Sequence, residues 1–184
     1  MVAVATLGAT PRYTIPRYPT AMIDRVPLAD GRIVTIRPVL PQDAGLTRDF
    51  VAGLSLESRY RRFQMGVGEL PPQLLRQFTE IDYAGHLALL AGVVDEAGRE
   101  AQVADVRYVI DPGSPAIDGL EADFALVVAD GWQRAGLGSD LIRRMARAAR
   151  AQGLARLHGE VLATNAPMLT LLRGLGARLR ARTG

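Results

Sequence analysis

One stretch of the sequence, DFALVVADGWQRAGLGSDLI from Asp123 to Ile142, limits the possible folds more than any other. An apolar run rich in β-branched residues stops at a turn, and a helical pattern begins after a short segment punctuated by glycines. The first turn of such a helix leaves about four backbone N–H groups unpaired, and the helix dipole places positive charge there. Gly136 and Gly138 let an anion approach those groups without a Cβ in the way. The pattern therefore predicts a phosphate or pyrophosphate site, although glycines that serve only packing produce the same pattern.

Composition excludes several other classes of protein. All 22 basic residues are arginine, so the lysine of a P-loop is missing, and the absence of cysteine rules out disulfides and thiolate catalysis. With only two histidines, we expect no metal site. The small net charge of +3 argues against nucleic-acid binding. No apolar run approaches the roughly 18 residues of a membrane span, and no signal-peptide pattern is present, so we expect a cytoplasmic protein without a membrane partner.

Periodicity divides the chain into an irregular, proline-containing arm at residues 1–20 and one domain at residues 21–184. Strands are expected as a hairpin within 22–38 and then at 86–94, 102–111, 121–129, 153–164 and 177–184. Helices are expected at 41–55, 56–63, 71–81, 136–151 and 165–176. This order predicts an α/β (α+β) class with a mixed sheet and helices on its faces. It disfavours a dinucleotide-binding fold, because the strands before the glycine turn form a meander.

Five stretches, in order along the chain, carry a family resemblance: DGRIVTIRPVLPQDA, LSLESRYRRF, TEIDYAGHLALLA, ADFALVVADGWQRAGLG and GEVLATNAPMLTLLRGLG. Over about residues 22–179 the chain resembles the GNAT superfamily of acyl-CoA-dependent N-acyltransferases. It looks most like the acetyltransferase domain of Pat-type bacterial protein acetyltransferases, which also occurs fused to acyl-CoA synthetases. The resemblance implies a mixed, mostly antiparallel sheet flanked by helices, with central strands 124–128 and 157–163 splayed apart. GNAT sheets usually have one more strand after the one expected here at the C-terminus, so a homodimer or the N-terminal arm would cover the open edge.

The resemblance also implies acetyl-CoA as the cosubstrate, with its pantetheine arm lying between the splayed strands. Backbone groups of Leu126, Val127 and Val128 would hydrogen-bond to that arm, and one main-chain N–H would polarise the thioester carbonyl. Asn165 would orient the pantetheine, and this residue type equally suits a plain helix N-cap. The amides expected to hold the pyrophosphate are those of Gln133, Arg134, Ala135, Gly136, Leu137, Gly138 and Ser139.

The acceptor implied by the resemblance is a primary amine, a protein lysine in Pat-type enzymes, and its chemistry favours a base. A lysine pKa of about 10.4 leaves about one amine in a thousand uncharged near neutral pH, a deficit of roughly 4 kcal/mol. A carboxylate can accept the proton during attack, directly or through water. Pat-type enzymes have a glutamate at the head of the central strand, where this chain has Asp123, one methylene shorter. Glu160 is the second candidate, Glu121 would share the face of Asp123, and His158 would share that of Glu160.

Other polar residues have two interpretations each. The arginines of ESRYRRF could guide an acidic protein substrate or the CoA phosphates, although a solvated helix face is the commoner role: Arg59, Arg61 and Arg62. A second arginine stripe is expected to be solvated: Arg143, Arg147 and Arg150. Three residues around the start of an expected strand would line the amine pocket or form a turn: Asp82, Tyr83 and His86.

Two functions are consistent with these features. The first is an acetyl-CoA-dependent N-acetyltransferase that works by direct attack of a primary amine, plausibly a protein lysine, because no cysteine can carry the acyl group. The rival is a non-catalytic acetyl-CoA-binding sensor or interaction module. It gains support from Asp123 and from Leu172, which stands where many GNAT enzymes carry a tyrosine that protonates the leaving thiolate.

Overall fold

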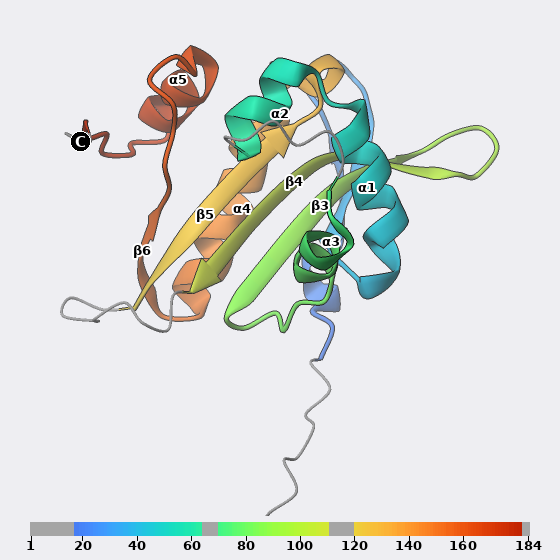
Figure 1. The fold of residues 1–184 in the computed structure, drawn as a ribbon, viewed down its shortest axis with the longest axis horizontal. Coiled ribbons are helices and arrows are strands. Elements are labelled where there is room, and N and C mark those ends of the chain that lie inside the picture. The colour runs from blue at the N-terminus through green and yellow to red at the C-terminus, as the bar shows by residue number, and fades with distance from the viewer. Residues whose placement is uncertain (1–16, 64–69, 111–119, 182–184) are drawn as a thin grey trace, which may run out of the picture.

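The computed structural model describes residues 17–63, 70–110 and 120–181, which form a twisted sheet with helices on both faces (Figure 1). The strands are β1 (Asp24–Pro27), β2 (Ile33–Pro38), β3 (His86–Val94), β4 (Glu100–Ile110), β5 (Leu120–Val128) and β6 (Leu154–His158). The helices are α1 (Ala44–Gly53), α2 (Leu56–Phe63), α3 (Pro72–Thr79), α4 (Leu137–Ala151) and α5 (Ala166–Gly174).

The six strands lie in the sheet in the same order as in the chain. Every neighbouring pair is antiparallel except β5 and β6. These two are parallel because α4, which connects them, returns the chain to the end of the sheet where β5 began. The predicted mixed, mostly antiparallel sheet is therefore confirmed. The parallel pair lies at one edge of the described sheet, and β1 lies at the other.

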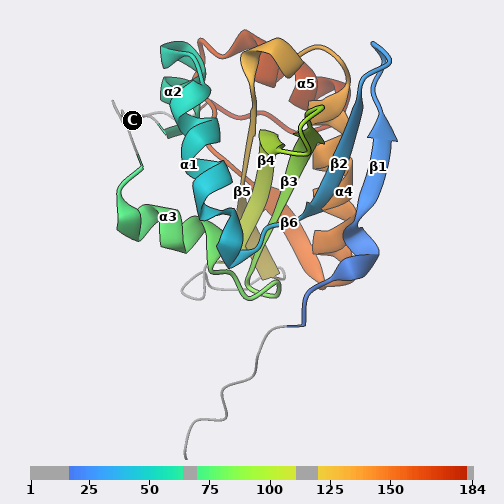
Figure 2. The same cartoon turned by 90° about the vertical axis from the view of Figure 1, so that its right-hand side faces the viewer.

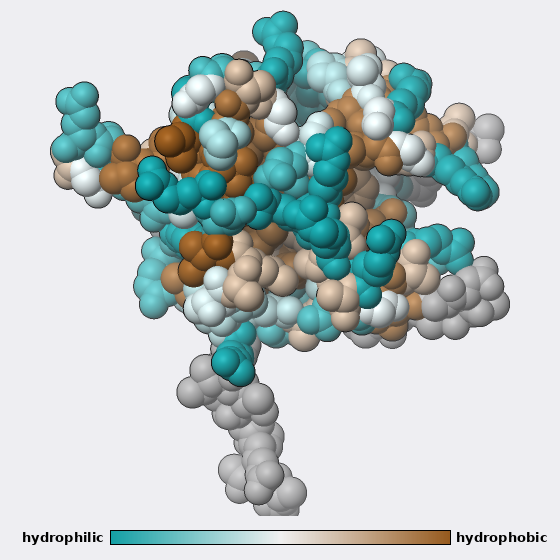
Figure 3. Space-filling model, turned by 180° about the vertical axis from the view of Figure 1, so that it is seen from behind, coloured by the Kyte–Doolittle hydropathy of each residue, from teal (hydrophilic) through white to brown (hydrophobic). Residues whose placement is uncertain are grey.

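Helix α4 covers one face of the sheet with a stripe of apolar side chains. Leu137, Leu141 and Met145 recur at helical spacing and are buried almost completely against apolar residues of β3, β4 and β5. The opposite side of α4 is hydrophilic, and Figure 3 shows hydrophilic residues gathered across the face that α4 and β1 form. The expectation for the second arginine stripe is confirmed, since all three members are exposed: Arg143, Arg147 and Arg150.

Helices α1, α2 and α3 lie on the other face of the sheet, as Figure 2 shows when the sheet is seen on edge. Phe50, Val51 and Leu54 from the α1 region form a second apolar cluster with Leu70 and Val127. Because successive residues of a strand point to opposite faces, Val127 faces these helices, whereas Leu126 packs in the core under α4. The residues of β5 therefore contribute to two separate cores.

Two sequence predictions about the end of the sheet are wrong. Residues 177–181 follow α5 without strand structure, although a strand was expected at 177–184. The strand expected to continue through 163 ends at His158, and residues 159–163 are irregular. Residues 177–181 alternate polar and apolar side chains, but alternation alone forms no strand where no neighbouring strand offers hydrogen-bond partners.

The N-terminal arm lies mostly outside the described residues, and so does the loop expected at 112–119. The described end of the arm docks at the far side of the sheet from β6, where the hydroxyl of Tyr18 donates a hydrogen bond to the carbonyl of Pro38. The ring of Tyr18 also contacts that of Tyr83 edge to face. Within the described residues, no helix is long and apolar enough to cross a membrane.

Candidate functional site

The candidate site begins where β5 and β6 part. Their pairing ends at Asp123 and His158, and β6 itself ends there, followed by Gly159. A Cβ on Gly159 would lie 2.7 Å from the carbonyl oxygen of Phe124, so only glycine allows this close approach. Beyond that point β5 and the segment after β6 separate, and a cavity of about 350 Å³ opens between them. Its size is within the usual range of small-molecule sites.

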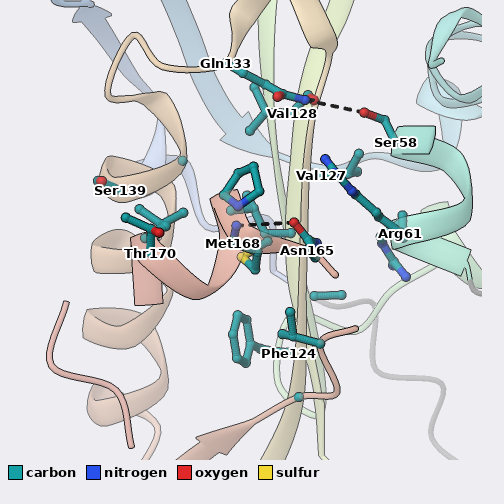
Figure 4. A pocket seen from close by; sticks show the side chains of 18 of the residues that line it. Ser58, Arg61, Phe124, Val127, Val128, Gln133, Ser139, Asn165, Met168 and Thr170 are labelled. Atoms are coloured by element: carbon teal, nitrogen blue, oxygen red, sulfur yellow. Dashed lines mark hydrogen bonds between the residues drawn. The ribbon is translucent and has the colours of Figure 1, made fainter. Parts of the chain in front are cut away.

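Several elements contribute walls to this cavity (Figure 4). One wall is the length of β5 from Phe124 to Val128, and the segment Gly159–Val161 faces it. The start of α4 and the first turns of α5 line the cavity on one side, and α2 lines it on the other. The predicted cofactor residues that line it are Leu126, Val127, Val128, Gln133, Arg134, Gly136, Gly138, Ser139 and Asn165.

The two glycines at the start of α4 have different structural roles. Gly136 has φ +86° in the left-handed region and forms the N-cap of α4, so a side chain there would be strained. A Cβ on Gly138 would contact Leu171 and Leu126 at 3.3 and 3.4 Å, so this glycine also serves the close packing of α4. Ala135 and Leu137 do not line the cavity, because their side chains are buried in the core. The positively charged end of the helix dipole therefore faces the cavity.

A polar network fastens α2 to the loop that follows β5. The carboxylate of Asp130 accepts hydrogen bonds from the backbone and hydroxyl of Ser55 and from the hydroxyl of Ser58. Burial opposes ionisation of Asp130, but these hydrogen bonds outweigh it and lower its pKa. The side-chain amide of Gln133 donates to the carbonyl of Val128 at 3.0 Å and to Ser58 at 3.4 Å (Figure 4). These contacts make α2 a fixed wall of the cavity.

Asn165 caps the helix that forms another wall. Its side-chain oxygen accepts a hydrogen bond from the backbone N–H of Met168 at 3.3 Å, and Pro167 occupies the first turn of α5 (Figure 4). Asn165 also lines the cavity while being largely buried. The N-cap role is therefore present, and the position remains compatible with a role toward a ligand.

The two candidate bases occupy different places. Asp123 does not line the cavity but lies at the last paired position of β5 and β6, with 65% of its side chain exposed and its Oδ1 2.9 Å from Nδ1 of His158. The other ring nitrogen of His158 is 3.8 Å from Glu121, which also pairs with Arg156 at 2.7 Å. Glu160 lines the cavity. The expectation that Glu160 shares a strand face with His158 is wrong, because β6 ends at His158.

Helix α2 contributes residues to the cavity that the sequence did not predict as cofactor-binding or catalytic. Ser58, Arg61 and Arg62 lie at helical spacing and all line the cavity, so a fully solvated role for these arginines is wrong. The spacing of these polar residues on one helical face was visible in the sequence, but its contact with β5 was not. Leu172 is buried and does not line the cavity.

The segment before β3 forms a turn. The carboxylate of Asp82 accepts hydrogen bonds from the backbone of Ala84 and His86, and the hydroxyl of Tyr83 donates to the carbonyl of Val39. Asp82, Tyr83 and His86 do not line the cavity. Of the two interpretations for these residues, the structure favours the turn and packing role.

A cleft between two parting parallel strands, closed at one end by a glycine-rich helix start, defines an acyltransferase of the GNAT type. The chain belongs to the acetyltransferase (GNAT) family, whose family model matches residues 73–177. It is therefore an enzyme of the acyltransferase class, and GNAT acetyltransferases generally use acetyl-CoA.

Curated relatives and solved structures agree with this assignment. An acetyltransferase of Pseudomonas aeruginosa is 33% identical over 149 residues, covering 81% of this chain and 77% of the relative. Acetyltransferase Pat of Mycolicibacterium smegmatis is 32% identical over 152 residues, covering 83% of this chain but only 43% of that longer relative. The solved GNAT domain of S. lividans PAT has a TM-score of 0.78 and 31% identity, covering 87% of this chain and 90% of that domain.

Proposed function

We propose that this enzyme transfers an acetyl group from acetyl-CoA to the side-chain amine of a protein lysine. The observation that carries the proposal is the cavity between β5 and the segment after β6, which ends at the start of α4. Among the described residues, β5 has no paired strand on its β6 side beyond Asp123, and this edge together with the positive helix end suits an amide-containing arm that ends in a diphosphate. The family supplies the acetyl-CoA chemistry, and the resemblance to Pat-type enzymes supplies the lysine acceptor.

The residues of the cavity fit acetyl-CoA in a definite order. Backbone groups of Leu126, Val127 and Val128 hold the pantetheine arm, and one N–H among them polarises the thioester carbonyl. The amides from Gln133 to Ser139 hold the diphosphate, with Arg134 beside them. Asn165 caps α5 and orients the pantetheine from the opposite wall.

Asp123 is the proposed base, and its contact with His158 strengthens that role. Its carboxylate is mostly exposed where β5 and β6 part, so a lysine on the surface of another protein can approach it. His158 donates to one carboxylate oxygen when Nδ1 carries the proton, which orients Asp123 and leaves its other oxygen available to the amine or to a bridging water. Glu160, inside the cavity, is the second candidate.

The reaction needs no covalent enzyme intermediate. The amine nitrogen attacks the thioester carbonyl directly while Asp123 accepts its proton, and the thiolate leaves and takes a proton from water, since Leu172 offers none. We further propose a cytoplasmic location, a domain that spans residues 21–184, and a homodimer.

Substitution of the two carboxylates tests this mechanism. Asp123→Asn is expected to lower kcat at least about tenfold while leaving acetyl-CoA affinity, measured by calorimetry, unchanged. Glu160→Gln serves as the comparison, because it changes the second candidate in the same way. Unchanged turnover in Asp123→Asn would remove this residue as the base. Tight binding of acetyl-CoA without any release of CoA, whatever amines or proteins are offered, would favour the non-catalytic module instead.

A further inference from the structure

Arg62 is a cation in the wall of the cavity, and no described residue serves as its anionic partner. Part of its side chain reaches the surface, but its guanidinium is buried enough that desolvation lowers its pKa to about 10, so it stays charged at neutral pH. Its guanidinium carbon lies 5.0 and 5.6 Å from the ring centroids of Phe63 and Phe78. Among the described residues, it makes no ion pair or hydrogen bond.

Asp105, the carboxylate that acts on Arg62 within the described part of the chain, is already paired with another arginine. Asp105 is buried and is held in a bidentate pair by Arg107, with distances of 2.8 Å to Nε and 2.6 Å to the terminal nitrogen. His86, which approaches Arg107, adds no charge at neutral pH because burial, with help from Arg107, lowers its pKa to about 4. Arg62, Asp105 and Arg107 therefore leave one net positive charge beneath α2.

The other charged residues that line the cavity either have a partner or lie at the start of α4. Arg61 forms an ion pair with Glu57, and Glu160 also has a partner. Arg134 lies at the start of α4, where the diphosphate is expected. Arg62 instead lines both the main cavity and a small hollow of about 10 Å³ behind it, and Val127 is shared by the two in the same way. A charge without a partner is expensive to bury, so a bound anion at this place would be strongly favoured.

Its position relative to β5 indicates which group of a ligand Arg62 meets. In the proposed function, on which this inference rests, the thioester carbonyl lies against the amides of Leu126–Val128. The side chain of Val127 points from that segment toward α2 and the helices around it, the side on which Arg62 lies. The acyl group, which extends from the thioester, is therefore the part of the cosubstrate nearest to Arg62.

We propose that Arg62 selects acyl-CoA thioesters whose acyl group ends in a carboxylate, with succinyl-CoA as the representative. Arginine recognises a carboxylate through two parallel hydrogen bonds, and a partly desolvated site strengthens them. The transfer itself balances as acetyl transfer does. The neutral amine forms the C–N bond at the thioester carbon, the C–S bond breaks, and the sulfur keeps the electron pair. The amine proton passes to Asp123, and the products are an N-succinyl amide and CoA.

Calorimetric titration with succinyl-CoA and butyryl-CoA tests the proposal without any acceptor. The two acyl groups have the same number of carbon atoms, and one of them ends in a charge. We expect succinyl-CoA to bind at least about tenfold more tightly, a factor that corresponds to about 1.4 kcal/mol. In Arg62→Met, which keeps an apolar stem against Phe63 and Phe78, the ratio should fall to about one, and acetyl-CoA should still bind.

Control variants and alternative outcomes separate this inference from the proposed function. Arg147→Met, on the exposed side of α4, should keep the full preference for succinyl-CoA. If Arg62→Met does not fold, Arg62→Gln replaces it. The comparison of succinyl-CoA with butyryl-CoA affinity on the unchanged protein tests the proposal in either case. Equal affinities for the two thioesters, or a preference for succinyl-CoA that survives in the Arg62 variants, would overturn the inference. The proposed function would still stand in that case as long as acetyl-CoA binds. A preference for acidic residues beside the acceptor lysine, lost in Arg62→Met, would assign Arg62 to the acceptor protein instead. Failure to bind any of the thioesters would overturn both proposals.

Discussion

Gly159 stands at the point where β5 and β6 part, and its replacement by alanine is the sharpest test of the site geometry. The new Cβ would lie 2.7 Å from the carbonyl oxygen of Phe124 and 3.3 Å from two atoms of its ring. The ring can turn, but the carbonyl belongs to β5, which is held in register by the pairing of Phe124 with Tyr108 of β4. The variant must therefore push the segment after β6 away from β5.

The size of the effect follows from this overlap. Adding a methyl group to a tightly packed position lowers the free energy of unfolding by about 1–3 kcal/mol. For a chain of this length, each kcal/mol shifts the melting temperature by about 2–4 °C, so the expected fall is about 2–12 °C. Because Phe124 and Gly159 both line the cavity, acetyl-CoA should also bind more weakly, by about tenfold if roughly 1.4 kcal/mol of the strain falls on the bound geometry.

Thermal unfolding and acetyl-CoA titration of two variants measure this effect. Gly174→Ala is the matched control, since a Cβ at this last residue of α5 meets no atom within 4 Å. It should melt at the temperature of the unchanged protein or slightly higher, because alanine is favoured over glycine in helices by up to about 1 kcal/mol. A Gly159→Ala variant that melts and binds like the control would refute the proposed close approach of the two strands.

Three further predictions concern residues around the site. Arg107→Met should destabilise the fold by about 3–5 kcal/mol in denaturant unfolding because Asp105 stays buried without a partner, and adding Asp105→Leu should recover most of the loss. If the double variant is no more stable, the ion pair is not the cause. The pKa of His86 is about 4 in the folded protein against an ordinary value of about 6.5, so the unfolded state binds more protons between these values. Stability should therefore fall as pH drops from about 6.5 toward 4, and a His86→Gln variant with the same pH slope would contradict this. Asn165→Ala should cost about 1 kcal/mol by removing the cap on Met168 and should weaken acetyl-CoA binding, whereas Asn165→Asp should keep the stability; equal melting of all three proteins would exclude the cap.

Much of the fold could be predicted because local patterns and long-range packing agree over most of the chain. The apolar stripe of α4 predicted both the helix and its buried face, and Asn165 with Pro167 predicted the start of α5. The predictions failed at residues 159–163 and 177–181, where strands were expected. A strand needs a partner along its length, and periodicity does not report whether a partner is there.

The candidate site shows the same division between local and long-range information. The glycines at 136 and 138 indicated a helix start that can face an anion, and the structure adds that Gly138 is also required for packing against Leu171. Asp123 and His158 are far apart in the chain, and their contact depends on the register of the two parallel strands β5 and β6. That register was not visible in either segment alone.

By itself the sequence determined the order of the elements, the family, and the glycine-rich turn that begins α4, because each depends on residues close together in the chain. Only the tertiary structure decided that α2 forms a wall of the cavity and that Arg62 lies there without an anionic partner among the described residues. A helical pattern shows which residues share a face. What that face packs against, and which charges are already neutralised there, depends on contacts between distant segments, and those arise only when the sheet and its helices assemble.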